Sequence, residues 1–211
     1  MVKIYHIVKK SNCDTQFRTA ILKAIVCAKR KDPNIKIYIA SGFFSERAPV
    51  PVSDFTDSIV GVNLKTLLNG LTVEIYGAYN GKDEFFDFCK SIKSAGASIS
   101  VFYKSKFHTK LFIIESAGKV IFEIIGSSNL TTCAYEGRRY IKTKFYNSYN
   151  SECDLILIDD MIDLTIDTNQ NVMLLKYDKN GNNISIDDRM KNTLYYLKML
   201  KESMADETKN I

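Results

Sequence analysis

The chain has 211 residues, a length typical of one domain or of one domain with a tail. Apolar residues make up 45% of it and charged residues 25%, which excludes intrinsic disorder, and ten Gly with three Pro exclude a collagen-like fibre. The net charge of +5 is uneven, because residues 1–159 hold 22 basic and 15 acidic side chains. This basic character suits a phosphate-bearing partner, although a solvated lysine-rich surface has the same composition.

In chain order, the first half alternates strand and helix signals. Asp14 is placed to cap the first helix and Pro33 to end it, while Gly70 and Gly96 close the next two helices. We expect a strand over 3–8, a helix over 14–33, a strand over 35–40, a helix over 63–69, a strand over 71–76, a helix over 82–95 and a strand over 98–103. This repetition predicts an α/β fold with a mixed, largely parallel β-sheet flanked by helices on both faces.

The second half reads differently, because strands follow one another directly. We expect a hairpin of strands over 109–114 and 119–125, a strand over 155–158, a second hairpin over 172–177 and 182–186, and a helix over 187–204. One face of this helix is apolar and packs on the chain's own core or on a partner helix. We expect residues 1–160 to form the main domain and residues 161–211 to add a C-terminal hairpin and amphipathic helix packed on it.

Five cysteines at wide spacings, without a Cys-x-x-Cys pair, exclude a disulfide framework and a zinc ribbon. Reduced thiols predict a cytoplasmic protein. The N-terminus carries no apolar signal segment, and no stretch reaches the ~18 apolar residues of a membrane span, so we expect no membrane association. The sequence has no spacing typical of a metal site, and we expect neither a metal nor another cofactor.

The residues that could carry chemistry lie between positions 107 and 152. His108 and Lys110 are two residues apart on an expected strand, so they point to the same face and offer an imidazole and an ammonium to an anion. Gly126-Ser-Ser-Asn129 follows the next strand and adds hydroxyls and a carboxamide donor. Glu152 could accept a hydrogen bond from the His108 ring and fix its tautomer. The other histidine, His6, is expected to be structural.

His108-x-Lys110, followed by Gly126-Ser127-x-Asn129 and Asn150-x-Glu152, resembles the signature of the phospholipase D superfamily. Over about residues 1–160 the chain is most similar to its single-motif nuclease branch, the metal-independent NgoFVII-like restriction endonucleases and related nucleases. The family has an Asp five positions after the lysine, where this chain has Glu115, and strand parity puts Glu115 on the face opposite Lys110. The stretch up to Gly126 is longer than in the family. Restriction enzymes of this type carry a DNA-recognition domain after the nuclease, whereas about 50 residues follow the resembling region here, so we expect sequence-specific recognition to be absent or to reside elsewhere.

The resemblance implies a phosphodiesterase in which His108 attacks phosphorus and forms a phosphohistidine. Lys110, Asn129 and Ser127 would then stabilise charge on the non-bridging oxygens, and Glu152 would orient His108. A second histidine must protonate the leaving oxygen. Because one motif supplies one histidine, a homodimer with a shared active site is expected.

Further residues are expected to contact the substrate. Ser41, Phe43, Phe44 and Ser45, which leave the strand at 35–40, would line the floor of the site, although a core position fits both phenylalanines equally well. Ser128 is also expected to contact the substrate.

Basic residues alternate with aromatic ones between 135 and 146 and either grip a phosphate backbone or line a surface loop. These basic residues are Arg138, Arg139, Lys142 and Lys144.

The expected function is therefore that of a DNA endonuclease, either restriction-type or non-specific, with nucleic acid as the partner. A phospholipase or phosphatidyltransferase of the same superfamily and a catalytically inactive nucleic-acid-binding module remain as alternatives.

Overall fold

Hydrogen bonding between strands builds one nine-stranded sheet in the computed structural model, in the order β12-β1-β11-β8-β7-β2-β5-β6-β13. The structure describes residues 2–9, 16–42, 56–57, 62–77, 79, 81–128, 138–141, 144–147, 152–166, 172–175, 194–199, 201–202 and 205–206. The sheet strands are β1 (Val2–Lys9), β2 (Lys36–Ala40), β5 (Thr72–Gly77), β6 (Ser98–Tyr103), β7 (Leu111–Ser116), β8 (Lys119–Gly126), β11 (Glu152–Asp159), β12 (Val172–Leu175) and β13 (Ala205–Asp206).

Two short pairs lie outside this sheet, and helices cover it. The pairs are β3 (Thr56–Asp57) with β4 (Val62–Asn63), and β9 (Arg138–Ile141) with β10 (Lys144–Asn147). The labelled helices are α1 (Gln16–Lys31), α2 (Leu64–Leu68) and α3 (Lys82–Ser94). Residues 194–199 and 201–202 are also helical and are called the C-terminal helical segment below. None of the described helices is long and apolar enough to span a bilayer.

The strand directions correct one prediction. Only the β2–β5 and β5–β6 pairs are parallel, and every other neighbouring pair of the sheet is antiparallel. The expectation of a largely parallel sheet was wrong because the predicted hairpin of β7 and β8 joins β2 in the antiparallel direction, and β11 and β1 add to β8 in the same alternating way, so only the β2-β5-β6 unit is parallel. The α/β class and the mixed sheet with helices on both faces are confirmed.

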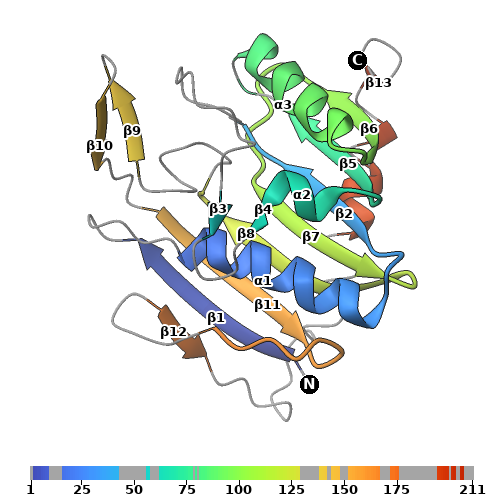
Figure 1. Cartoon of the computed structure of the whole chain (residues 1–211), viewed down its shortest axis with the longest axis vertical. Helices are drawn as coiled ribbons and strands as arrows, with labels where there is room; N and C mark the ends of the chain where they lie inside the picture. The colour runs from blue at the N-terminus through green and yellow to red at the C-terminus, as the bar shows by residue number, and fades with distance from the viewer. Residues whose placement is uncertain are drawn as a thin grey trace.

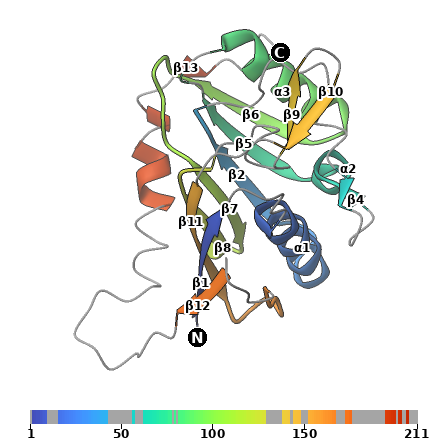
Figure 2. The ribbon, with the colours of Figure 1, turned by 90° about the vertical axis from the view of Figure 1, so that its left-hand side faces the viewer.

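Two apolar layers explain how the helices are held. Helices α1, α2 and α3 cover one face, where buried side chains such as Ile21, Leu68 and Phe88 join one core cluster (Figure 1). The C-terminal helical segment lies on the other face, as Figure 2 shows, where Leu194 and Leu197 join a second cluster. Each sheet face is thus apolar at alternate positions, as a sheet covered on both sides requires.

Most predicted elements agree with the observed ones to within one to three residues. The predicted strand at 109–114 instead begins at Leu111, so His108 and Lys110 lie in an irregular segment that leads into it. The predicted strand at 155–158 begins earlier, at Glu152. The cap at Asp14, the strand at 182–186 and the start of the last helix at 187 fall outside the described residues.

Strand register aligns one row of residues across the sheet. His6 pairs with Leu155, which pairs with Ile125, and Ile125 pairs with Leu111, which in turn pairs with Ala40. Just beyond this row the chain leaves each strand at the same edge of the sheet. The segments that carry His108, Lys110, Ser127 and Ser41 all lie beyond it, which brings residues far apart in sequence to one edge.

A buried carboxylate ties the C-terminal helical segment to the opposite face. Glu74 on β5 is 5% exposed and accepts a hydrogen bond from the Tyr76 hydroxyl at 2.5 Å. Its other oxygen lies 2.6 Å from the Lys36 ammonium and 3.2 Å from that of Lys201, which also sits over the Phe102 ring at 4.9 Å. Burial raises the pKa of Glu74, but the hydrogen bonds from Lys36 and Tyr76 outweigh burial and hold that pKa below its ordinary value.

We predict that Glu74→Gln destabilises the protein and weakens its sensitivity to acid. A carboxyl whose folded pKa is lowered stabilises the fold above its unfolded pKa of ~4.3, and this stability is lost as pH falls through the folded pKa. Losing the charge-assisted hydrogen bonds should cost about 1–3 kcal/mol at pH 7, measured by urea unfolding. The difference from wild type should shrink as pH falls below ~4.3.

Asp87→Asn, at an exposed position of α3, is the matched control. Its ion pair with Lys90 is 4.0 Å long and exposed, so the change should be within about 0.5 kcal/mol at each pH. A pH-independent loss in Glu74→Gln would contradict the assignment.

Candidate active site

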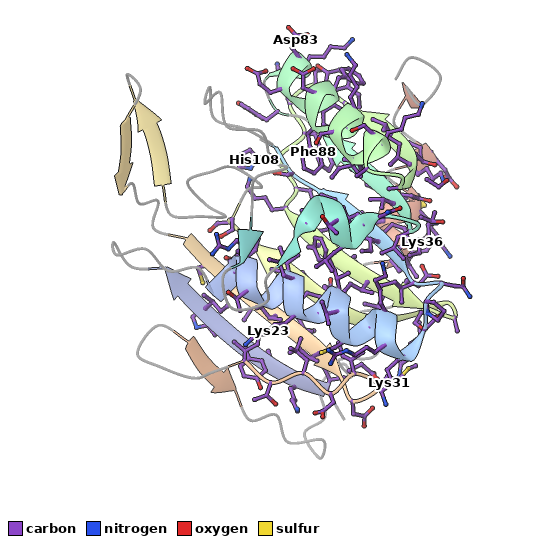
Figure 3. All side chains as sticks on the ribbon, in the orientation of Figure 1. Lys23, Lys31, Lys36, Asp83, Phe88 and His108 are labelled. Atoms are coloured by element: carbon purple, nitrogen blue, oxygen red, sulfur yellow. The ribbon has the colours of Figure 1, made fainter. Side chains whose placement is uncertain are left out.

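The His108 imidazole and the Lys110 ammonium are in direct contact at the edge of the sheet. Lys110 Nζ lies 2.8 Å from His108 Nδ1 and 3.2 Å from Nε2, and it also donates to the His108 carbonyl oxygen at 2.8 Å. His108 is exposed, whereas Lys110 is 9% exposed. Figure 3 shows His108 reaching out from this edge. A buried cation beside an exposed imidazole can hold an anion against the ring nitrogens.

The turn after β8 is fastened to the start of β11. The Ser127 amide donates to the Cys153 carbonyl at 3.1 Å, and the Cys153 amide donates to Ser127 Oγ at 2.9 Å. The Ser127 side chain is exposed. Its hydroxyl is therefore held in place as an acceptor while its proton can be donated outward.

Asp154 is a site residue that sequence reasoning missed. It is 1% exposed and accepts hydrogen bonds from the Ser128 amide at 3.1 Å and from the Ser128 hydroxyl at 2.5 Å. These bonds fix the backbone of the turn. Ser128 was predicted to contact substrate, but its hydroxyl is buried and points to this carboxylate. The sequence did contain a signal for Asp154, because it lies two residues before Ile156 and so on the same buried face of β11. A carboxylate at a buried position requires hydrogen-bond partners.

Lys110, Ser128 and Asp154 line one small cavity, whose other walls include the apolar side chains of Phe17 and Phe112. The cavity lies between the sheet edge and α1. It therefore brings a buried cation and a buried carboxylate into one apolar enclosure, where electrostatic effects are stronger than in water. Asp154 and Lys110 are thus two side chains of opposite charge that line the same cavity.

The loops from β2 and β5 form the adjoining wall. Ser41 is 1% exposed, and its amide donates to the Tyr76 carbonyl at 3.1 Å, so the backbone after β2 stays bonded to β5, while contact of Ser41 with substrate stays a prediction. The Gly42 carbonyl accepts from the Tyr79 amide at 2.7 Å. A Cβ at Gly42 would lie 3.1 Å from the Phe107 carbonyl oxygen, which shows how closely this loop approaches the segment of His108.

The other predicted site residues are described in part. Phe43, Phe44, Ser45, Asn129 and Lys142 lie outside the described residues, so their predicted roles stay predictions. Glu152 begins β11 at the same edge as the Ser127 turn, and its side chain is not described.

The predicted basic stretch forms the β9–β10 hairpin. Arg138 pairs with Asn147, and Lys144 pairs with Ile141, while the side chain directions of Arg138, Arg139 and Lys144 are not described. The hairpin is inserted between β8 and β11, which both meet the site edge. Contact of these residues with substrate stays a prediction.

Glu115, which stands where the resembling family has Asp, lies away from His108. It accepts a hydrogen bond from the Tyr38 hydroxyl at 2.5 Å, and Tyr38 belongs to the core cluster on the face opposite Phe112. A register shift separates it from Ile114. Its role is therefore in packing near the far end of β7.

Within the described part of the chain, no three His, Cys, Asp or Glu side chains gather as metal ligands would. The groups at the edge are an imidazole, an ammonium and a hydroxyl. Together they can bind an oxyanion and present a nitrogen nucleophile to it.

Comparisons with known proteins give distant similarities only. No family model matches the sequence, and a search of curated proteins finds no relative. Nuc from Salmonella typhimurium, a phospholipase D family member, is similar in structure with a TM-score of 0.44 and 13% identity, over 98% of this chain and 97% of that one. Polyphosphate kinase from Porphyromonas gingivalis has a TM-score of 0.38 and 9% identity, over 76% of this chain and 24% of that one.

We predict that Gly126→Ala disrupts the site and the fold around it. A Cβ there would lie 2.5 Å from the Cys153 carbonyl oxygen and 2.7 Å from the Asp154 Cα, both backbone atoms of the paired strand. The strands would have to separate, at a cost of about 3 kcal/mol measured by thermal or urea unfolding.

Gly118→Ala is the matched control, because a Cβ there meets nothing within 4 Å. Its φ of +80° is unfavourable for alanine, so a loss of about 1–2 kcal/mol is expected. Equal losses in the two variants would contradict a steric requirement at Gly126.

Proposed function

We propose that this protein is a metal-independent phosphodiesterase, a DNA endonuclease acting through a phosphohistidine on His108. The observation that carries the proposal is the contact of 2.8 Å between the Lys110 ammonium and the His108 ring, at an exposed edge beside the Ser127 turn. The resemblance of the His108, Lys110 and Gly126–Asn129 motifs to the phospholipase D superfamily supports the same chemistry.

The reaction follows from the placement of these groups. A ring nitrogen of His108 attacks phosphorus in line, so a P–N bond forms while the P–O bond to the leaving group breaks. A phosphate oxygen takes the place of the ring as partner of Lys110, whose charge stabilises the oxygens as negative charge develops on them. Ser127 and Asn129 donate alongside, and Glu152 orients the ring. Water then cleaves the P–N bond and restores His108.

Charge around the nucleophile favours nucleic acid as substrate. Lys104 and Lys106 are exposed on the turn that leads into His108, and β9, whose sequence includes Arg138 and Arg139, follows β8 in a segment inserted before β11. Phosphate contacts of this kind supply most of the non-specific affinity for DNA. The alternative substrate, a phospholipid with the same phosphodiester group, is favoured by the exposed apolar side chains of Tyr195 and Met199 on the C-terminal helical segment.

Cleavage in the presence of excess EDTA tests the proposal. Plasmid and single-stranded DNA should be cut, and His108→Ala should lose about 10⁶-fold in rate because the nucleophile is gone. Glu152→Gln should lose less, since it disturbs only the orientation of the ring. A covalent protein–DNA adduct, stable in alkali and labile in acid, should appear in a rapid alkaline quench.

The alternatives give different results in the same assay. Cleavage that EDTA abolishes and magnesium restores would refute the mechanism. Hydrolysis of phosphatidylcholine vesicles without DNA cleavage would assign the lipid function, and DNA binding with neither activity would identify an inactive module.

We also propose that the active enzyme is a homodimer with a shared site. The chain holds two histidines, and His6 Nε2 lies 2.8 Å from Cys153 Sγ, in a different arrangement from that of His108 and Lys110. The acid that protonates the leaving oxygen is then His108 of a second copy, across a two-fold axis.

Mixing wild type with equal His108→Ala protein, after subunit exchange, tests the shared site. Only dimers with two intact His108 side chains would be active, and random exchange makes about one quarter of all dimers of this kind. Activity per total protein should therefore fall to about one quarter of the wild-type value, whereas independent sites would give about one half. A fall to one half, or a monomer by sedimentation at fully active concentrations, would contradict the dimer without affecting His108 as nucleophile.

A further inference from the structure

An exposed aromatic ring stands beside the proposed nucleophile. Tyr79 is 40% exposed, and its ring lies edge-on to the His108 ring, with centroids 5.3 Å apart and planes at 80°. Both backbone polar groups of Tyr79 are held, because its amide donates to Gly42 at 2.7 Å and its carbonyl accepts from the Lys106 amide at 3.3 Å. The ring is therefore held at a defined place on the rim of the site while part of its surface faces solvent.

The turn that carries Lys106 adds a cation at the same rim. Lys106 has a φ of 62°, a left-handed conformation that side chains with a Cβ adopt at a cost of ~1–2 kcal/mol. Glycine would remove this cost, yet the position holds an exposed ammonium two residues before His108.

A second tyrosine reaches the same segment from the other face of the sheet. The Tyr196 hydroxyl lies 3.2 Å from Thr109 Oγ1, between His108 and Lys110 in sequence, and Tyr196 is 44% exposed. Aromatic and basic side chains from three separate parts of the chain therefore lie in or beside the segment that carries the nucleophile. This combination is typical of surfaces that bind single-stranded nucleic acid, where bases stack on rings and lysines track the backbone.

We propose that this rim selects single-stranded nucleic acid, with Tyr79 stacking on the base next to the scissile phosphate and Lys106 binding the neighbouring phosphate. The proposal rests on the proposed function and names its substrate class. In a duplex, both faces of each base are covered by neighbouring bases, so a ring beside the attacked phosphate has no base face to contact. In a single strand the base one sugar away from that phosphate can rotate onto the ring. DNA and RNA strands share this chemistry.

Binding measured apart from cleavage tests the proposal. The full chain with His108→Asn, which retains a polar side chain but lacks the nucleophile, is titrated against fluorescent oligo(dT), oligo(U) and a DNA duplex of equal length at one salt concentration. We expect at least one of the single strands to bind about tenfold or more tightly than the duplex.

Variants then assign the preference to residues. Tyr79→Leu in this background should weaken single-strand binding about 5- to 150-fold, whereas Tyr79→Phe keeps the ring and should stay within about twofold. Lys106→Gln should lower the slope of log affinity against log salt by about 0.7. Lys31→Gln is the matched control, since Lys31 is exposed at the opposite end of the molecule from His108 (Figure 3) and should leave the slope unchanged.

The outcomes separate this inference from the proposed function. Duplex binding as tight as that of both single strands, or equal binding by Tyr79→Leu and Tyr79→Phe with unchanged circular dichroism, would overturn the inference. Tight single-strand binding that depends on Tyr79, together with no cleavage by the wild-type protein, would support the inference and refute the enzymatic function.

Discussion

Strand register is the constraint on which the site depends. Antiparallel pairing of β7 with β8, and of β8 with β11, sets Leu111, Ile125 and Leu155 side by side, and the antiparallel β2–β7 pair adds Ala40 to the same row. Side chains alternate between the faces of a strand, so a slip of one residue in any of these pairs would reverse its set of side chains. The apolar layers on both faces prevent such a slip. The site is thus positioned by the same burial that stabilises the sheet.

At this edge β8 and β11 approach so closely at Gly126 that the packing there also sets the hydrogen bonds of Asp154. Only a residue without a Cβ fits at Gly126, and the space it leaves lets Asp154 accept both polar hydrogens of Ser128. A buried carboxylate with two donors is stable where an unpartnered one would be costly. This carboxylate lines the same cavity as Lys110, the cation of the proposed oxyanion site. Packing and electrostatics are therefore coupled at one glycine.

The C-terminal helical segment connects the opposite face of the sheet to this edge. Lys201 reaches Glu74, and Leu197 joins the apolar cluster beneath. The same segment carries Tyr196 to Thr109, next to the proposed nucleophile. Lys201 is half exposed and Glu74 keeps Lys36 and Tyr76 as partners, so the buried apolar contacts of Leu194 and Leu197 restrict where this segment can lie more than the ion pair does. A part of the chain distant in sequence from the motif residues thereby helps to shape the surface around them.

Local signals in the sequence were sufficient to predict most of the elements and part of the site. Apolar periodicity and turn residues located most helices and strands, and the spacing of His108 and Lys110 predicted that the two side chains meet. They do meet, although the strand begins only at Leu111, because a lysine side chain is long enough to reach the ring from an irregular segment. Sequence analysis also placed Glu115 away from the site, since parity within a strand depends only on neighbouring residues.

Other features depend on contacts between distant segments. The direction of the strands was mispredicted because the alternation of elements in the first half does not determine how the hairpin that follows is added to the sheet. Tyr79 has no motif around it, and its position follows from hydrogen bonds to Gly42 and Lys106. The sequence by itself determined the elements and the groups able to act on a phosphate, because both depend on residues close together along the chain. Only the tertiary structure decided that Asp154 and Tyr79 belong with His108, because strand register and loop contacts bring them together across the sheet.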